Sequence, residues 1–202
     1  MPAGRRVASG RPPRLDYLVP DSAGKALYMA LKPIDVQPLE AALRIEPFNP
    51  TYADLVLSWV QDAREAYWLA PKTAPPLTTA HIRAWAAAAY QPLLFARAGW
   101  ARPVAYGELN ILSGPRRHYW LGHLILDPTW RGRGLGRAFT RLLLARSFSC
   151  CGAQAVSLVV FPENLRAIAC YRAAGLYDDG YEVHVLPPYD RRVRLLRMTA
   201  EQ

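Results

Sequence analysis

The alternation of apolar and polar residues divides the chain beyond Ala42 into short strands and amphipathic helices. Short apolar or alternating runs bounded by turn residues predict strands over 43–47, 92–98, 104–112, 119–126, 155–161, 181–186 and 193–198. Apolar residues at helical spacing predict helices over 52–63 (after Thr51 as a cap), over 79–90, around Leu135 to Leu143, and over 164–174 before a Gly175 cap. This order predicts an α/β (α+β) fold, a mixed and mostly antiparallel sheet of about six to seven strands flanked by about four helices.

The first 41 residues have a different composition from the rest of the chain. Proline recurs at positions 12, 13, 20, 33 and 38, and little of this segment is apolar. We expect residues 1–41 to form a flexible or loosely docked N-terminal extension, and residues 42–202 to form one domain. A chain of 202 residues suits a single domain with an added segment.

The composition excludes disordered, collagenous and integral membrane proteins. With 51% hydrophobic and 20% charged residues the chain can bury a core, and no apolar run approaches the ~18 residues of a membrane-spanning helix. No secretory signal is recognisable, and Cys150 and Cys151 are adjacent, which suits reduced thiols, so we expect a cytoplasmic protein. The four histidines (His81, His118, His123 and His184) are scattered, so we expect no metal site.

The net charge of +9 is spread along the chain instead of being gathered in one run. Such a distribution fits an anionic ligand at one local site, and it argues against nucleic acid as the partner. A nucleic-acid-associated protein that uses the Arg-containing extension remains a third alternative, tested by the salt dependence of its binding.

One glycine-rich loop carries the clearest chemical signal. The segment from Leu124 to Gly136 (LILDPTWRGRGLG) reads as a strand, a turn and the start of an amphipathic helix. Helix N-termini carry unsatisfied N–H donors and glycines allow close approach, so this loop is suited to a pyrophosphate. The dinucleotide fingerprint fails because position 137 is Arg, and the P-loop fails because no Gly-Lys-Ser/Thr follows.

A second motif follows about thirty residues later. Asn164 and Tyr171 lie seven residues apart, on one face of the predicted helix, within Asn164-x-x-Ala167-x-x-x-Tyr171-x-x-x-Gly175. Together with Arg131-Gly-Arg-Gly-Leu-Gly136, this segment resembles the GNAT superfamily of acyl-CoA-dependent N-acetyltransferases, most closely over residues 104–177. The resemblance implies that 42–202 is a GNAT-type domain whose central parallel strands, 119–126 and 155–161, splay apart to admit acetyl-CoA as the acyl donor.

The resemblance also implies which residues hold that donor. Backbone groups of strand 119–126 would pair with the pantetheine arm, loop amides would hold the pyrophosphate, Asn164 would bond the pantetheine, and Tyr171 would lie near the thioester sulfur. The implied donor-binding residues are Leu124, Ile125, Leu126, Arg131, Gly132, Arg133, Gly134, Leu135, Gly136, Asn164 and Tyr171.

Chemistry assigns provisional roles to three side chains. A tyrosine with a pKa near 10 can protonate the departing thiolate, so Tyr171 is the candidate general acid. An amine must lose a proton before it attacks a thioester, and either Glu108 or His123 is the candidate base. By resemblance, an acceptor pocket would use Trp59, Asp62, Glu65, Tyr67, Trp68, Asp178, Asp179 and Glu182.

We therefore expect an N-acetyltransferase that moves an acetyl group from acetyl-CoA to a primary amine by direct attack in a ternary complex. A small-molecule amine is favoured over a protein amine, because Val159 stands where some N-terminal-acetylating relatives carry Glu. The alternatives are a non-catalytic acyl-CoA-binding regulatory module and an N-terminal or lysine protein acetyltransferase. We expect no membrane partner, and the sequence leaves a homodimer open.

Overall fold

The computed structural model describes residues 43–97, 99–112 and 117–202; the expected extension over 1–41 lies outside them. A seven-stranded sheet runs in the order β1-β2-β3-β4-β5-β7-β6. Its strands are β1 (Leu43–Pro47), β2 (Gln91–Arg97), β3 (Ala105–Ile111), β4 (His118–Leu126), β5 (Ala155–Val160), β6 (Tyr177–Leu186) and β7 (Arg191–Glu201). Every pair is antiparallel except β4 and β5, so the predicted mixed, mostly antiparallel sheet is confirmed.

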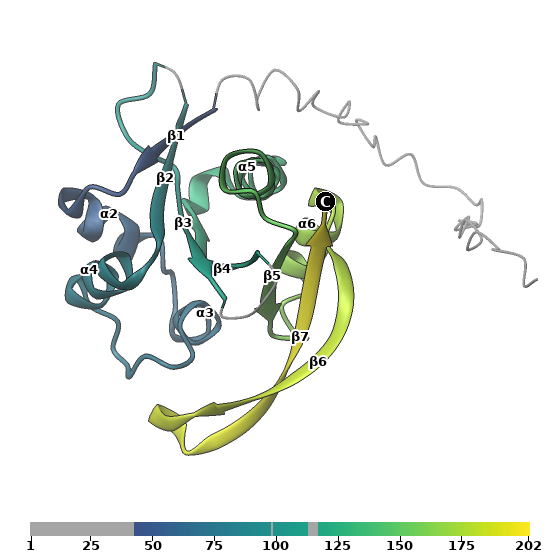
Figure 1. Cartoon of the computed structure of the whole chain (residues 1–202). Coiled ribbons are helices and arrows are strands. Elements are labelled where there is room, and N and C mark those ends of the chain that lie inside the picture. The colour runs from purple at the N-terminus through teal and green to yellow at the C-terminus, as the bar shows by residue number, and fades with distance from the viewer. Residues whose placement is uncertain (1–42, 98, 113–116) are drawn as a thin grey trace, which may run out of the picture. The chain divides into compact units, whose positions relative to one another are not determined.

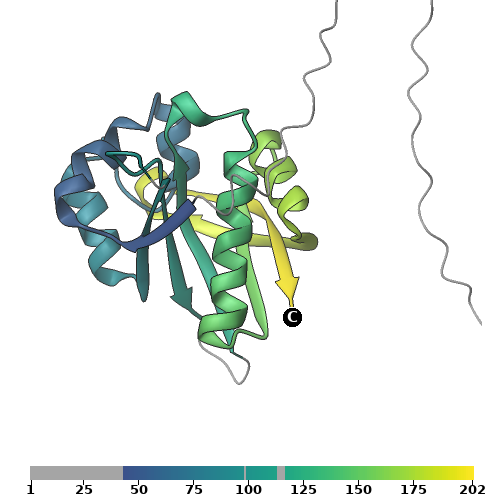
Figure 2. The same ribbon diagram turned by 90° about the horizontal axis from the view of Figure 1, so that it is seen from above.

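Helices cover both faces of this sheet. They are α2 (Ala53–Ser58), α3 (Ala63–Leu69), α4 (Thr79–Ala88), α5 (Leu135–Cys151) and α6 (Leu165–Ala174). Helices α2 and α4 lie on one face and α5 and α6 on the other (Figure 1). Figure 2 shows α5 running lengthwise over the strands. No helix in the described ranges is long and apolar enough to cross a bilayer.

The strands supply a separate core to each face because successive side chains point to opposite sides. On β2, Leu93 and Phe95 pack in the cluster of α5 and α6, whereas Leu94 between them packs in the cluster of α2 and α4. On β3, Leu109 and Tyr106 divide in the same way. The central strands are therefore covered on both faces, which holds the site described below on a rigid frame.

Most element boundaries agree with the sequence analysis within about two residues, but β6 starts four residues before the predicted strand 181–186, β7 extends beyond 193–198 at both ends, and the region near residue 60 differs in kind. The single helix predicted over 52–63 is wrong: α2 ends at Ser58, and α3 starts at Ala63 with the Asp62 carboxylate accepting from the Glu65 amide at 2.7 Å. Thr51 is not a helix cap, because it lies within a 3-10 turn that Asn49 caps. The apolar spacing continues through the break, so periodicity could not reveal the second helix.

The parallel strands β4 and β5 pair only at one end. Their register covers His118–Ala155, Tyr119–Val156 and Trp120–Ser157 and then stops. Beyond this point β4 continues to Leu126 and β5 to Val160, but the two strands do not pair with each other. The sheet is thus split at its centre, and the second half of β4 faces the split with backbone groups that β5 does not bond.

Candidate active site

A bulge in β4 lies next to the split. β3 pairs Glu108 with Gly122 and Tyr106 with Ile125, so β4 has one more residue than β3 between these two pairs. His123 lies in this stretch with φ at 45°, in the left-handed region that few residues other than glycine adopt. A bulge can redirect a side chain beside an active site, and this one brings His123 to Glu108.

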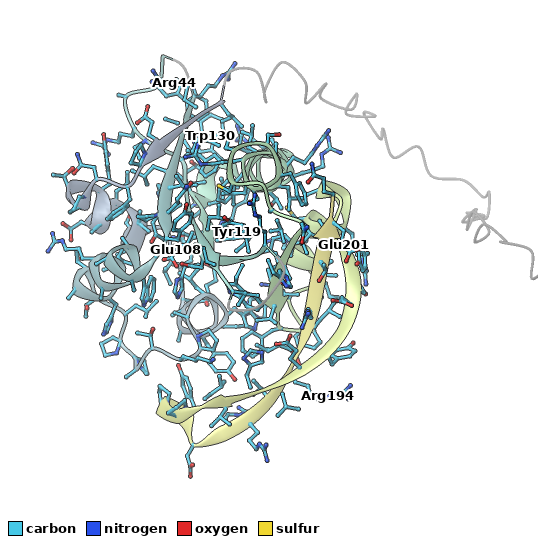
Figure 3. All side chains as sticks on the ribbon, in the orientation of Figure 1. Arg44, Glu108, Tyr119, Trp130, Arg194 and Glu201 are labelled. Carbon is cyan, nitrogen blue, oxygen red and sulfur yellow. The ribbon has the colours of Figure 1, made fainter. Side chains whose placement is uncertain are left out.

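Glu108 is a buried carboxylate with three hydrogen-bond donors. Its side chain, which Figure 3 shows in the middle of the fold, belongs to a residue only 3% exposed. The Tyr106 hydroxyl donates to Oε1 at 2.6 Å, His123 Nδ1 donates to Oε2 at 2.9 Å, and Asn110 Nδ2 donates to Oε2 at 3.4 Å. Burial raises the pKa of the carboxyl, but the bonds from His123, Tyr106 and Asn110 outweigh it and hold the pKa below its usual value. Glu108 is therefore ionised at neutral pH.

The ionised carboxylate fixes the tautomer of His123. An acceptor at Oε2 requires a proton on Nδ1, so in the neutral imidazole the lone pair is on Nε2. The ring stacks on Trp85, with centroids 4.1 Å apart and planes 5° from parallel. The Trp85 indole is itself held, since its Nε1 donates to Thr73 Oγ1 at 3.2 Å. His123 thus presents a basic nitrogen on a ring that is held in place from two sides.

Glu108 and His123 both line a cavity of about 250 Å³. Its walls come from the segment after α3, from β3, β4 and β5, and from the β6–β7 hairpin that curves beneath α3 in Figure 1. Trp68, Trp120, Phe161 and Leu195 supply apolar surface. The two candidate bases, Glu108 and His123, are therefore in contact with each other at the wall of a cavity.

The glycine-rich loop leads into a helix without a side-chain cap. Gly132 and Gly134 have φ of 74° and 80°, a conformation that disfavours other residues, and they turn the chain into α5. Asp62, Thr78 and Asn164 cap α3, α4 and α6, but no side chain caps α5. The first-turn amides of this 17-residue helix therefore remain available to an anion.

The three arginines at this turn differ in what they contact. Arg131 donates to Glu65 Oε1 at 2.5 Å, to the Trp59 carbonyl at 2.8 Å and to the Leu126 carbonyl at 3.0 Å, so its guanidinium ties α3 to the end of β4. Its amide donates to the Pro128 carbonyl.

The other two arginines flank the start of α5. Arg133 lies over the Trp130 ring. Arg137 has a buried Nε for which the described residues provide no hydrogen-bond partner. In the sequence, Arg137 serves only to reject the dinucleotide fingerprint, but this unpaired donor in the first turn of α5 makes it a candidate anion ligand.

The second motif lies on α6, as the spacing predicted. Asn164 Oδ1 accepts from the Ala167 amide at 3.2 Å as the N-cap, and Gly175 closes the helix with φ at 113°. Tyr171 packs against the core on the α5 side, and its hydroxyl forms no hydrogen bond with the described residues. Burial is the main cause that raises the pKa of Tyr171, and the neighbouring Cys170 raises it further. The Tyr171 hydroxyl therefore stays protonated.

Gly136 and Cys170 serve the contact between α5 and α6. A Cβ on Gly136 would lie 3.1 Å from Cys170 Sγ, so the glycine allows these two helices to approach closely. Burial raises the pKa of the Cys170 thiol, and the thiol is free. Cys170 is thus a packing residue.

The acids expected in an acceptor pocket are bonded elsewhere. Asp62 caps α3, Glu65 binds Arg131, and Asp178 forms an exposed pair with Arg172. Asp179 and Glu182 both contact Arg197, and Trp59 is buried in the core at 2% exposure. Among these expected residues Trp68 alone lines the cavity. Within the described ranges, no group of three or more His, Cys, Asp or Glu side chains could hold a metal.

Comparison with solved structures finds the same fold in proteins of low sequence identity. A structure of AAC(6')-Ib with ribostamycin and coenzyme A has a TM-score of 0.62 and 19% identity, over 80% of this chain and 94% of that one. The spermidine N-acetyltransferase from Vibrio cholerae with CoA and spermine gives 0.66 and 17%, over 80% and 96%. A GNAT-family acetyltransferase from Bacillus anthracis gives 0.67 and 15%, over 79% and 95%.

The comparison with curated proteins gave no match. The family model "Acetyltransferase (GNAT) family" matches residues 41–176, which include the split strands, the glycine-rich loop and both motif residues of α6. This match covers most of the chain and ends at Leu176, after the Gly175 cap. The chain therefore belongs to the GNAT acetyltransferase family and is an acyltransferase.

Proposed function

We propose that this enzyme transfers an acetyl group from acetyl-CoA to the primary amine of a small molecule by direct attack in a ternary complex. One observation carries the proposal: an uncapped helix N-terminus and a strand edge that β5 does not pair lie in consecutive segments of the chain, and that same strand carries His123, which is bonded to Glu108 of the neighbouring strand. An anionic carrier with an extended arm and an amine acceptor fit these features together.

The residues around the split suit acetyl-CoA. Over Leu124, Ile125 and Leu126, β4 has an edge that β5 does not pair, although the Leu126 carbonyl accepts from Arg131, and the pantetheine arm can extend this edge as an added strand. The amides from Gly132 to Gly136 and the unpaired Arg137 Nε suit its pyrophosphate. Arg131 contributes by holding the loop in position, because its guanidinium is already bonded. Acetyl-CoA supplies the activated thioester carbonyl.

The Glu108–His123 pair supplies the general base. His123 Nε2 accepts a proton from the acceptor ammonium, directly or through water, and the freed amine forms the new N–C bond. Glu108 stabilises the resulting imidazolium through the Nδ1–H bond and stays ionised. Asn110 and Tyr106 hold the carboxylate in place, so the roles of base and positioning group are divided between two adjacent side chains.

Tyr171 is the general acid in this proposal. As the C–S bond breaks, the Tyr171 hydroxyl gives its proton to the departing thiolate, and CoA leaves as the free thiol. The attacking nitrogen loses its second proton as the amide forms, and this proton restores the Tyr171 hydroxyl, directly or through water, while the proton taken by His123 passes to solvent. Its raised pKa keeps the hydroxyl protonated until that moment. Asn164 retains its cap of α6 and uses its remaining amide group for the pantetheine.

Two lines of support favour a small-molecule acceptor. The structural neighbours include proteins solved with an aminoglycoside and with spermine, both small-molecule amines. The cavity of about 250 Å³ is walled by the segment after α3 and by the β6–β7 hairpin, which suits a compact ligand better than a protein segment.

The experiment is an initial-rate study of free-thiol release from acetyl-CoA with varied amine. We expect intersecting double-reciprocal lines, an acetylated amine in the mass spectrum and no acetylated enzyme. Parallel lines with acetylated enzyme would refute direct transfer. Acetyl-CoA binding without thiol release for any amine would favour the regulatory module, and absence of binding would refute the donor assignment.

A further inference from the structure

The walls of the cavity beside His123 combine polar groups with a set of aromatic and aliphatic side chains. Trp68, Trp120 and Phe161 contribute rings, and Leu186 and Leu195 contribute aliphatic surface. We infer that the acceptor is a compact monoamine with an aromatic or bulky apolar body, and that polyamines and aminoglycosides are poor acceptors. This inference rests on the proposed acetyl transfer and specifies its substrate class.

The charges at the cavity argue against a polycation. Glu108 supplies the one carboxylate among the described lining residues, and its oxygens already accept from Tyr106, His123 and Asn110. Lys72 lines the same cavity and adds positive charge. A ligand with several ammonium groups would lose water from each of them and find one carboxylate, so its desolvation would be poorly compensated.

The acid that contacts His184, a residue of the cavity wall, is also engaged. Glu182 bonds His184 at 2.9 Å and Arg197 at 2.6 Å, so it is already ion-paired within its own hairpin, where Asp179 shares the same arginine. Burial raises the pKa of the Glu182 carboxyl, but the bonds from Arg197 and His184 lower it by more than burial raises it. The carboxylate is therefore ionised and already paired. A second ammonium group of a substrate would have to compete with the Arg197 guanidinium for it.

The aromatic wall has an unoccupied ring. Trp85 stacks on His123, and Arg64 lies over Trp68, whereas Trp120 forms no stacked-ring or cation–π pair with the described residues. Trp120 lies where the pairing of β4 with β5 ends, three residues before His123, and it lines the cavity. A flat substrate ring can stack on this indole while its amine reaches the imidazole.

Cavity size supports a ligand with a single ring system. Ligand pockets typically enclose ~300–1,000 Å³, whereas this cavity encloses about 250 Å³. A phenylethylamine or an indolylethylamine is compact and has one charge, whereas an aminoglycoside has several linked sugar rings and several charges.

The test compares kcat/KM for five amines at one pH and saturating acetyl-CoA: tryptamine, 2-phenylethylamine, n-butylamine, spermidine and kanamycin. We expect the aromatic monoamines to exceed spermidine and kanamycin at least tenfold. A polycation within threefold of tryptamine, or above it, would overturn the inference while leaving acetyl transfer intact. Failure of all five amines, together with absent acetyl-CoA binding, would instead refute the proposed function.

Two variants locate the preference in the cavity. Trp120→Ala should lower kcat/KM for tryptamine at least tenfold relative to n-butylamine, and Trp120→Phe, which keeps a ring and controls for folding, should restore most of it. Lys72→Glu should raise the spermidine-to-tryptamine ratio severalfold. Equal losses for tryptamine and n-butylamine in Trp120→Ala, with the melting temperature of Trp120→Phe unchanged, would place the aromatic group elsewhere and overturn the inference.

Discussion

Replacing Glu108 with Gln tests the division of labour between the carboxylate and the imidazole. The side chain keeps its size, but one carboxylate oxygen becomes an NH2 group. If that group faces His123, the imidazole must reverse its tautomer so that Nδ1 accepts and Nε2 carries the proton. If it faces Tyr106 instead, the phenol loses an acceptor 2.6 Å away. In the first case Nε2 can no longer act as a base.

The expected size of the effect follows from the lost interaction. A hydrogen bond to a charged group contributes ~1.5–3 kcal/mol. If this stabilisation of the imidazolium is lost in the transition state, kcat falls about 10- to 100-fold, since ~1.36 kcal/mol corresponds to a factor of ten. Acetyl-CoA affinity should stay unchanged, because Glu108 is on β3 and the donor-binding groups are on β4 and α5.

The assay is thiol release at saturating acetyl-CoA, with calorimetry for donor affinity. Glu182→Gln is the matched control, because Glu182 forms the other Glu–His pair near the cavity, with His184 at 2.9 Å. We expect this control to change kcat less than threefold. Unchanged turnover in Glu108→Gln would remove Glu108 from the mechanism, and equal losses in both variants would show a general charge effect.

Three further outcomes test separate parts of the structure. Tyr171→Phe should lower kcat at least tenfold with unchanged thermal stability, because no described residue bonds the hydroxyl; unaltered kcat would exclude it as the acid. Asn164→Ala should cost ~1 kcal/mol of unfolding free energy and Asn164→Asp almost none, because both Asn and Asp cap helices. Equal losses for the two variants in chemical denaturation would contradict the role of Asn164 as the cap. The difference in free energy of unfolding between wild type and Glu108→Gln should be largest above the ordinary Glu pKa of ~4.3 and be lost as the pH falls through the lowered pKa of Glu108. A difference in urea unfolding that does not change with pH would contradict the ionised carboxylate.

Most elements of the fold could be predicted because each carries its own periodicity. The strand predicted over 43–47 has the same bounds as β1. The helix predicted over 164–174 corresponds to α6 together with its N-cap Asn164, and Gly175 is its C-cap, as predicted. The break between α2 and α3 could not be predicted from apolar spacing. It depends on the Asp62 carboxylate competing for the Glu65 amide, a local contact that leaves the apolar pattern unchanged.

The candidate site could be predicted only where residues close together in the sequence determine its conformation. The loop conformation depends on Gly132 and Gly134, which are visible in the sequence as residues that tolerate positive φ. The contact between Glu108 and His123 depends on a bulge across two strands, which strict alternation of side chains does not reveal. The resemblance placed Glu65 and Asp178 near the acceptor. Their pairing with Arg131 and Arg172 on other elements depends on tertiary structure, which the sequence does not show.

The measurement that tests the central claim most directly is calorimetric binding of acetyl-CoA to Gly134→Asp and Gly134→Asn. Asn and Asp have the same shape and both tolerate the left-handed conformation, and a Cβ at Gly134 meets nothing within 4 Å, so the pair differs in charge alone. Repulsion of the pyrophosphate predicts that the Asp variant binds at least tenfold more weakly than the Asn variant, ~1.4 kcal/mol or more, while wild type binds in the micromolar range. Equal binding by the two variants, or no binding by wild type, would contradict the assignment of this loop to the acetyl donor.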